Sequence, residues 1–336
     1  MKRILAVLLV TVPLFAVPAF AQKQFQITNR VKLGGEGFWD YLTYEQGAHR
    51  LFITRGTRVM VVNTKSLKVT GDIPDLSGIH GVTLAPELRR GFVSNGGDNT
   101  VTIFDLKTLK KLDSVKVGER PDAILYEPFS KDVFTFNARS HDLTAIDAAT
   151  SKVVGTVPMD GRPEFPASDG AGKLYVTMED KSEIAEVDVK NLKVLDTWPT
   201  APCEEPSALA FDVAHHRLFT GCHNKMMAVV DSDSGKVITT VPIGEGVDAG
   251  RFNPRTQEVF MSCGEGVLTI IHEDSPDKYT VKQNLATVKG ARTMALDQEH
   301  NVAYLVTAQR EDKPRAPGQR PAIVPGTFEL IVAKPE

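Results

Sequence analysis

Six short segments recur along this chain at an almost constant interval, and this repeat restricts the fold more than any other feature. Segments such as TIFDLKTLKK and AVVDSDSGKV join two β-rich runs through a turn that contains an acidic or amide side chain. An Asp or Asn there can accept hydrogen bonds from the backbone two residues ahead and close a tight turn. The anchor residues are spaced by 42, 42, 41, 43 and 41 positions: Asn63, Asp105, Asp147, Asp188, Asp231 and, in a degenerate copy, His272.

Each unit contains further β-rich runs around its anchor. Along the chain, a unit begins with a short first run and continues with a second run, such as LFITRG, LYVTME or VFMSCG. A third run ends at the anchor, and a fourth run follows it. Four antiparallel strands per unit of roughly 42 residues are typical of a β-propeller blade. A seventh upstream run, AYLVTA, predicts a seventh blade.

The last unit lacks a fourth strand, whereas an extra strand, FQITNRVKL, precedes the first unit. We therefore expect the N-terminal strand to complete the last blade, because this closure hides open sheet edges. An open stack of six and a half blades is the alternative. The sequence thus predicts an all-β, seven-bladed β-propeller of four-stranded antiparallel blades, as a single domain over residues 22–336.

Residues 1–21 have the layout of a secretory signal peptide: the positive start MKR, an apolar run, and a small-x-small cleavage site at its end. A membrane anchor is the alternative, although two prolines interrupt the apolar run. No later stretch approaches the ~18 apolar residues that a spanning helix needs. We therefore expect a periplasmic or secreted protein with no membrane span after cleavage.

The second runs resemble those of the YVTN β-propeller repeat family, with LYVTMED as the nearest copy. The resemblance covers nearly all of the chain after the signal peptide. It implies a seven-bladed propeller that is exported in bacteria, often without an assigned activity. The WD-repeat (WD40) pattern fits less well, because no unit carries its His or its Trp-Asp pair.

Polar residues recur at the start of the innermost strands, where a propeller opens into its central channel. Counting eleven residues back from the start of each second run, or ten in the fourth unit, gives a ring of one residue per unit: Asp40, His80, Asp122, Glu164, Ser207, Asp248 and Arg292. Arg120 and Arg162 lie close by in sequence. Mixed charges suit a small polar ligand, a cation or a partner's side chains. The alternative is that these groups only solvate loop ends and pair with one another. The predicted ligand-binding residues are Asp40, His80, Arg120, Asp122, Arg162, Glu164, Asp248 and Arg292.

The loops between second and third strands should lie on the same face and form an outer ring. Their polar residues are Asn95, Asp98, Asn137, Arg139, His141, Glu179, Asp180, residues 223–225 and Glu265. By contrast, His215 and His216 lie in a turn on the opposite face, where we expect plain surface residues.

The seventh unit carries a loop insertion at residues 308–326 that is about fifteen residues longer than its equivalents, and loops of such length are uncommon without a function. It contains four prolines and four basic residues. We expect either a lid or partner-binding arm beside the channel mouth, or a surface insertion.

Three cysteines follow the signal peptide: Cys203, Cys222 and Cys263. All should lie on the mouth face, and an oxidising compartment favours one disulfide. Cys203 with Cys222 is the favoured pair, because a loop adjusts readily to the required separation, and Cys263 is the alternative partner. The sequence lacks a C-x-x-C pair, which argues against a Cys/His metal site, and lacks C-x-x-C-H, so covalent haem is not supported.

Recognised catalytic and nucleotide-binding motifs are absent from the sequence. We therefore favour a non-catalytic binding or scaffold propeller, without predicting a cofactor, although a metal ion at the channel mouth is an option. Propellers of lactonases and of periplasmic dehydrogenases resemble this architecture, so an enzyme that uses acidic residues and His80 is the alternative. Without its leader the chain carries 37 basic and 42 acidic side chains, which argues against nucleic-acid binding. We expect a monomer with a small polar ligand or a protein partner.

Overall fold

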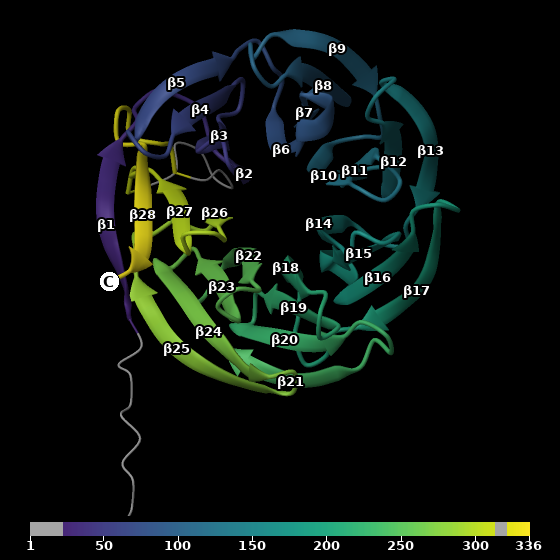
Figure 1. Cartoon of the computed structure of the whole chain (residues 1–336), viewed down its shortest axis with the longest axis vertical. Coiled ribbons are helices and arrows are strands. Elements are labelled where there is room, and N and C mark those ends of the chain that lie inside the picture. Colours follow the sequence, from purple (N-terminus) through teal and green to yellow (C-terminus); the bar gives the residue numbers. More distant parts are fainter. Residues whose placement is uncertain (1–22, 313–320) are drawn as a thin grey trace, which may run out of the picture.

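The computed structural model describes residues 23–312 and 321–336, and these residues form seven four-stranded antiparallel sheets arranged in a ring (Figure 1). The seven-bladed propeller predicted from the repeat is therefore confirmed. The expected signal peptide, residues 1–21, lies outside the described residues. Within the described ranges, no helix has the length and apolar character needed to cross a membrane.

The first three blades follow one another in the chain, each with its innermost strand first. Blade one contains β2 (Leu42–Glu45), β3 (Arg50–Thr54), β4 (Val59–Asn63) and β5 (Lys68–Ile73). Blade two contains β6 (Ile79–Ala85), β7 (Arg90–Asn95), β8 (Thr100–Asp105) and β9 (Lys111–Lys116), with the 3-10 turn η1 (Pro86–Leu88) between its first two strands. Blade three contains β10 (Pro121–Glu127), β11 (Asp132–Asn137), β12 (Asp142–Asp147) and β13 (Lys152–Pro158).

The next three blades repeat this order. Blade four contains β14 (Pro163–Ser168), β15 (Lys173–Met178), β16 (Glu183–Asp188) and β17 (Lys193–Pro199), with η2 (Glu179–Lys181) after its second strand. Blade five contains β18 (Pro206–Asp212), β19 (Arg217–Cys222), β20 (Met226–Asp231) and β21 (Val237–Pro242). Blade six contains β22 (Val247–Asn253), β23 (Glu258–Cys263), β24 (Val267–Ser275) and β25 (Lys278–Ala286).

Blade seven is built from both ends of the described chain, as the unpaired terminal strands predicted. It contains β26 (Met294–Asp297), β27 (Val302–Thr307), β28 (Glu329–Pro335) and, outermost, β1 (Phe25–Lys32). β1 runs antiparallel to β28 along the rim (Figure 1), and an ion pair between Arg30 and Glu329 supports the pairing. The closure leaves no blade with a missing strand.

The repeated acidic anchors close the turns between third and fourth strands. Asp105 Oδ1 accepts hydrogen bonds from the backbone N–H of Lys107 at 3.1 Å and of Thr108 at 2.7 Å. These bonds favour the charged carboxylate and lower the pKa of Asp105. The sixth copy differs, because β24 continues through His272 as far as Ser275. The extra length of β24 and β25 determines where Glu273 lies.

The core lies between neighbouring blades, where the second and third strands are almost entirely buried. Aromatic rings meet across these boundaries: Phe52 and Phe104 at 5.9 Å, and Tyr175 and Phe211 at 5.1 Å between ring centroids. The fourth strands face solvent and are mostly polar, as in β9. A rigid ring of this kind holds the first residue of every inner strand around one axis, which is where the candidate site lies.

Candidate functional site

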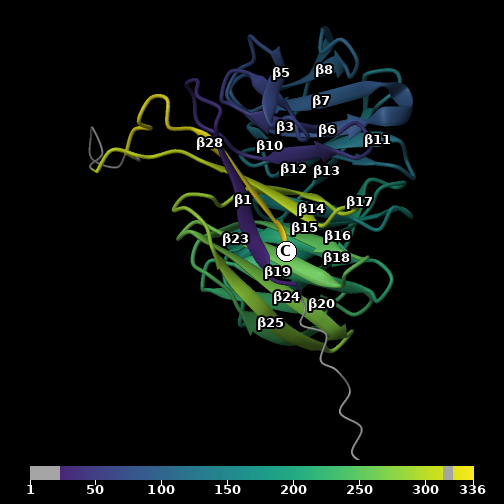
Figure 2. The ribbon, with the colours of Figure 1, turned by 60° about the vertical axis from the view of Figure 1, so that its left-hand side comes forward.

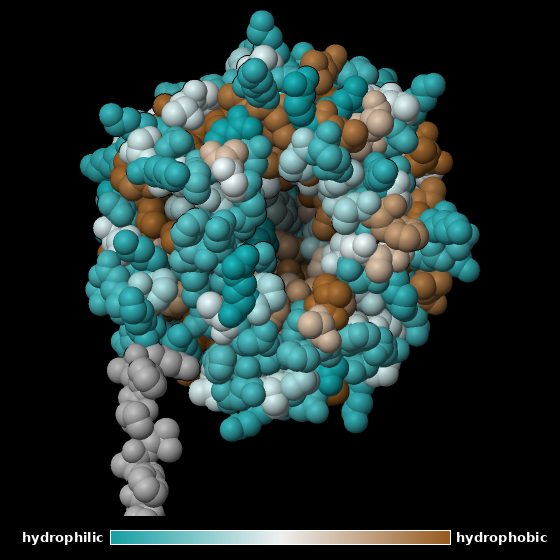
Figure 3. Space-filling view, in the orientation of Figure 1, coloured by the Kyte–Doolittle hydropathy of each residue, from teal (hydrophilic) through white to brown (hydrophobic). Residues whose placement is uncertain are grey.

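The eight predicted ligand-binding residues line one pocket at the mouth of the central channel. This mouth pocket has a volume of about 1090 Å³. Figure 3 shows the ring from one face, where the surface is hollowed at the axis. The seven ring positions come from seven different blades. Ser207, the only uncharged member, is buried and donates a hydrogen bond to the Val247 carbonyl at 2.8 Å, so it links blades five and six.

Bulges in the inner strands turn the ring side chains toward the channel. In blade two the register of β6 against β7 slips between Ile79 and Val82, next to His80, and blades three to six show equivalent slips. Bulges of this kind re-aim a side chain and interrupt the ladder of backbone hydrogen bonds. In blade two a buried hydroxyl replaces the lost bonds: Ser94 Oγ accepts from the Gly81 N–H at 2.8 Å and donates to the Asp122 carbonyl at 2.5 Å.

Those buried hydroxyls were missed in the sequence, although the repeat contains the signal. Ser or Thr occupies the same place in four of the second strands: Thr54, Ser94, Thr177 and Ser262. Each is buried and bonds the backbone of an inner strand or of the segment leading into one. In the sequence this position resembles any other strand residue, because the bulge opposite it cannot be recognised there.

An imidazole lies between two carboxylates on one side of the mouth pocket. His80 Nδ1 is 2.7 Å from Asp40 Oδ2 and 3.4 Å from Asp122 Oδ1. Burial alone lowers the pKa of His80, but the hydrogen bond to Asp40 and the charge of Asp122 outweigh it, so the pKa lies above its ordinary value. Burial raises the pKa of Asp122 to about 6, which places a proton on this carboxyl within the range used for acid catalysis.

The segment that carries Asp40 is held by a buried arginine. The Arg55 guanidinium donates to the carbonyls of Gly35, Glu36 and Gly37 at 3.0–3.1 Å and stacks 3.5 Å from the centre of the Phe328 ring. Gly37 has φ of +99°, and a Cβ there would lie 2.7 Å from the Arg55 carbonyl oxygen, so only glycine fits. Asp40 therefore approaches His80 from a fixed backbone.

Glu164 adds a third carboxylate on the far side of the channel axis. Burial raises its pKa well above the ordinary value, and the charges of Asp122, Glu179 and Asp248 raise it further. Carboxylates brought together in this way disfavour one another's ionisation unless a cation lies among them. The mouth pocket is therefore suited to receive positive charge.

The arginines neutralise part of this charge. Arg292 Nη1 lies 2.8 Å from Asp248 Oδ2, and Arg162 pairs with Glu179 at the rim. Arg120 is exposed and makes no ion pair within the described part of the chain. The expectation that the ring residues pair with one another is thus met by Arg292 with Asp248 and by His80 with Asp40 and Asp122. Among the described residues, Asp40, Asp122 and Glu164 make no ion pair with an arginine.

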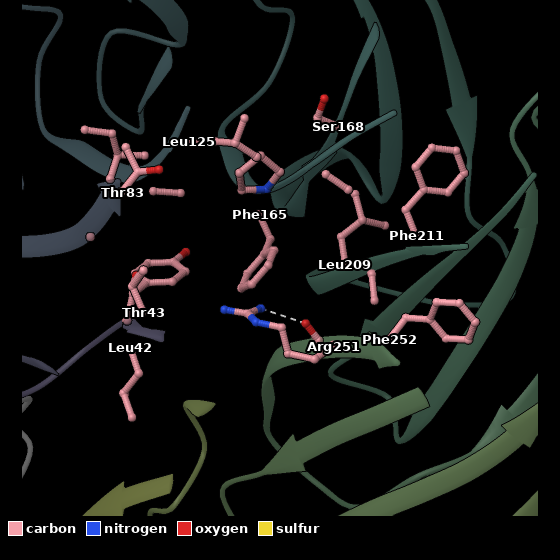
Figure 4. Close-up of a pocket in the computed structure, with 18 of the residues that line it drawn as sticks. Leu42, Thr43, Thr83, Leu125, Phe165, Ser168, Leu209, Phe211, Arg251 and Phe252 are labelled. Carbon is pink, nitrogen blue, oxygen red and sulfur yellow. Dashed lines mark hydrogen bonds between the residues drawn. The ribbon is translucent and has the colours of Figure 1, made fainter. Parts of the chain in front are cut away.

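A narrow waist separates the mouth pocket from a second cavity. Tyr41, Phe165 and Arg251 converge on the channel axis, with the Arg251 guanidinium carbon 5.2 Å from the centre of the Phe165 ring. Arg251 also donates to the Gly250 carbonyl at 2.7 Å (Figure 4), and burial lowers its pKa to about 10. The cavity beyond has a volume of about 340 Å³, and its walls combine apolar side chains such as Leu125, Leu209 and Phe252 with polar ones such as Thr83 and Ser168 (Figure 4). Counting along the inner strands did not predict these waist residues, because their side chains differ from blade to blade.

The predicted outer ring divides into two groups. Arg139, His141, Glu179 and His223 line the mouth pocket. His223 Nδ1 lies 3.0 Å from Glu205 and 3.7 Å from Glu179. Asn95 and Asn137 do not take part, because both are buried and bond threonines of the next strand, Asn95 to Thr102 at 2.9 Å for example. Their role is to hold the hairpin, which corrects their placement among the exposed polar groups.

The long insertion lies beside the mouth pocket where it is described. Residues 308–312 and 321–326 extend away from the ring (Figure 2), and Arg310 pairs with Ile323 in an isolated bridge. The Arg310 guanidinium carbon lies 5.4 Å from the centre of the Trp39 ring, and both residues line the mouth pocket. The middle of the insertion lies outside the described residues, so its predicted role as a lid or arm stays a prediction.

Cys203 precedes β18, Cys222 ends β19 and Cys263 ends β23. Cys203 and Cys222 form a disulfide with a Cα separation of 5.6 Å, which is the pair favoured from the sequence. Cys263 is free and buried, and burial raises its pKa to about 12, which leaves a thiol of low reactivity.

No family model matches the chain, and no curated protein is significantly similar to it. Among solved structures, a chain from the crystal structure of a mitotic checkpoint complex is similar with a TM-score of 0.77. That similarity covers 99% of this chain and 98% of the other at 15% identity, so it shows the fold alone. Since 1834 solved chains match, the fold by itself does not identify a function.

Proposed function

We propose that this protein is a non-catalytic binding propeller of the bacterial cell envelope, related to the YVTN repeat proteins, that takes a small polar ligand with a cationic group at its channel mouth. The observation that carries the proposal is the mouth pocket itself. It holds Asp40, Asp122 and Glu164 without an arginine partner among the described residues, and its arginines lie at the rim or against Asp248.

The depth of the charges favours a ligand with a positive end. The Asp40 and Asp122 side chains are only 15% and 14% exposed, whereas Arg162 is 41% exposed. An ammonium or guanidinium group would enter the channel toward the carboxylates, and the polar remainder of the ligand would meet Arg120 and Arg162. Charge-assisted hydrogen bonds of this kind are stronger than neutral ones. A lysine or arginine of a protein partner could supply the same group.

The test is a thermal-shift screen of the purified protein against amines, amino acids, sugars, lactones and short basic peptides. A ligand that raises the unfolding midpoint should lose its effect in Asp122→Asn and Glu164→Gln. Asp233→Asn is the matched control, because that carboxylate pairs with His216 at an exposed position away from the pocket. A shift that persists in both mouth variants, or no shift with any compound, would contradict the proposal.

A hydrolase is the second candidate, and one observation favours it. Asp122 has a pKa of about 6 and lies 3.4 Å from His80, which is an arrangement that can donate and accept a proton near neutral pH. The two candidates separate on turnover. A binding protein leaves lactone and ester substrates intact, whereas a hydrolase consumes them and loses that activity in Asp122→Asn while it still binds them.

A further inference from the structure

Three side chains that the sequence did not connect meet on the face opposite the mouth, between blades five and six. Asp212 ends β18, His215 lies in the following turn, and Glu273 lies near the end of the extended strand β24. His215 Nδ1 is 2.6 Å from Asp212 Oδ2 and 3.5 Å from Glu273 Oε1. One donor atom from each of the three residues lies within 4.8 Å of the others. His215 is therefore not the plain surface residue expected from the sequence.

Both carboxylates of this cluster are withdrawn from water. Asp212 is 2% exposed and Glu273 is 3% exposed. Asp212 Oδ1 accepts from the Ala214 N–H at 3.0 Å, and Glu273 Oε1 accepts from the Tyr279 hydroxyl at 3.3 Å. Glu273 Oε2 is buried and has no hydrogen-bond partner in the described structure. A buried oxygen without a donor is rare in a folded protein and calls for a ligand, an ion or a proton.

The arginine next to this cluster does not neutralise it. Arg217 begins β19, but its guanidinium donates to Asp231 at 2.7 Å and to Asp277 at 2.9 Å. Within the described residues, the ion pairs of Asp212 and Glu273 are both made with the His215 imidazole.

We propose that Asp212, His215 and Glu273 bind a Zn²⁺ ion that joins blade five to blade six. One imidazole nitrogen and two carboxylate oxygens form a donor set that zinc accepts, and ligands about 2.0–2.2 Å from the metal lie roughly 3.3 Å apart at tetrahedral geometry. The observed separations of 2.6 and 3.5 Å bracket that spacing, and the shorter one is a hydrogen-bond distance that would lengthen by about 0.7 Å when the metal replaces the proton. A water molecule can complete the tetrahedron, because the His215 side chain is 39% exposed.

The donor set disfavours the common hard cations. Ca²⁺ takes six to eight oxygen ligands, and Mg²⁺ prefers an octahedron of oxygens and water, so neither gains from an imidazole nitrogen held at the centre of the cluster. Zinc bound by Oε1 would place positive charge beside the orphaned Oε2 of the same carboxylate and remove the repulsion between the two carboxylates. Because Glu273 belongs to blade six and the other two ligands to blade five, the ion would stabilise the boundary between these blades.

The experiment is calorimetric titration of untagged, chelator-treated protein with ZnCl₂, together with thermal unfolding in zinc and in chelator. The titrations are made in a His80→Ala, His223→Ala background, so that neither the Asp40, His80 and Asp122 group nor the Glu179, Glu205 and His223 group contributes a second site. We expect one ion per chain and a midpoint that rises by several degrees, because an ion that binds only the folded state stabilises it. His215→Ala and Glu273→Gln should each weaken binding by at least about tenfold, since each loses one of three protein ligands.

His216→Ala is the matched control, because the adjacent imidazole pairs with Asp233 and lies outside the cluster. It should bind zinc as the parent does. The proposal is overturned if zinc does not bind, or if it binds with equal affinity in His215→Ala and in the control. If zinc has no effect and Glu273→Gln alone raises the midpoint in chelator, the two carboxylates share a proton instead. Should Glu273→Gln fail to fold, His215→Ala still decides the question, because its side chain is partly exposed.

Discussion

The propeller carries an Asp–His–carboxylate cluster at each face, and the two differ in what surrounds them. At the mouth, His80 contacts Asp40 and Asp122 in an open pocket that is also lined by five arginines. On the opposite face, His215 contacts Asp212 and Glu273, both almost fully buried, beside an arginine engaged elsewhere. Similar donor sets therefore imply different chemistry. Exchange of ligand suits the cluster that lines an open pocket, and a retained ion suits the cluster whose two carboxylates are almost fully buried.

The largest expected change in the free energy of unfolding comes from removing a positive charge at the mouth. Arg292→Met leaves Asp248 without its 2.8 Å ion pair and removes positive charge from the carboxylate ring. Loss of one partner of a partly buried pair should lower the free energy of unfolding by about 3 kcal/mol. Urea unfolding at pH 7 measures this change.

Arg162→Met is the control for that comparison, since its pair with Glu179 lies at the rim and the arginine is 41% exposed. It should cost less than about 1 kcal/mol. Equal losses in the two variants would mean that the depth of a pair in the mouth pocket does not determine its contribution.

The second prediction concerns the buried cluster without metal. The Glu273 pKa rises from 4.5 to about 7 in the folded protein, so the unfolded state releases its proton first as the pH increases. The folded protein should therefore lose stability between about pH 4.5 and pH 7, by on the order of 2–3 kcal/mol. Glu273→Gln should abolish that loss, which urea midpoints at pH 4.5, 6 and 8 in chelator would reveal. A parent protein with a flat profile over this window would count against the buried pair.

The smallest effect is expected from the corresponding change at the mouth. The Asp122 pKa rises from 3.8 to about 6, so this carboxyl also disfavours folding as the pH rises through that window. Asp122→Asn should raise stability at pH 7 by only about 1 kcal/mol, because the variant also loses the attraction to His80. Asp40→Asn should act in the opposite direction, since Asp40 holds the closer contact with His80 at 2.7 Å. Stabilisation by both variants would show that His80 is neutral in the folded protein.

The sequence predicted the mouth pocket well because the repeat fixes both the fold and the position of each inner strand. Counting back from the second strands placed Asp40, His80, Asp122, Glu164 and Asp248 around one axis, and the structure brings them into one pocket. The same counting could not separate exposed loop residues from Asn95 and Asn137, because burial depends on the following strand.

The cluster on the opposite face could not be predicted by this approach. Glu273 reaches Asp212 and His215 only because β24 and β25 extend beyond the length of their counterparts in other blades. The repeat is degenerate at His272, so the sequence gives no register for that extension. Contacts that depend on a departure from the repeat lie outside what a periodic pattern can indicate.

The pairing of β1 with β28 has a consequence for how the molecule is made. The Arg30–Glu329 contact joins residues 299 positions apart, so the ring stays open until the last blade has been synthesised. Contacts of such long range slow folding, and partly folded chains expose strand edges that can aggregate. The two candidate sites therefore become complete at different stages of folding. The Asp212–His215–Glu273 cluster needs only two adjacent blades, whereas the mouth pocket, which includes Arg292 before β26, is complete only after closure.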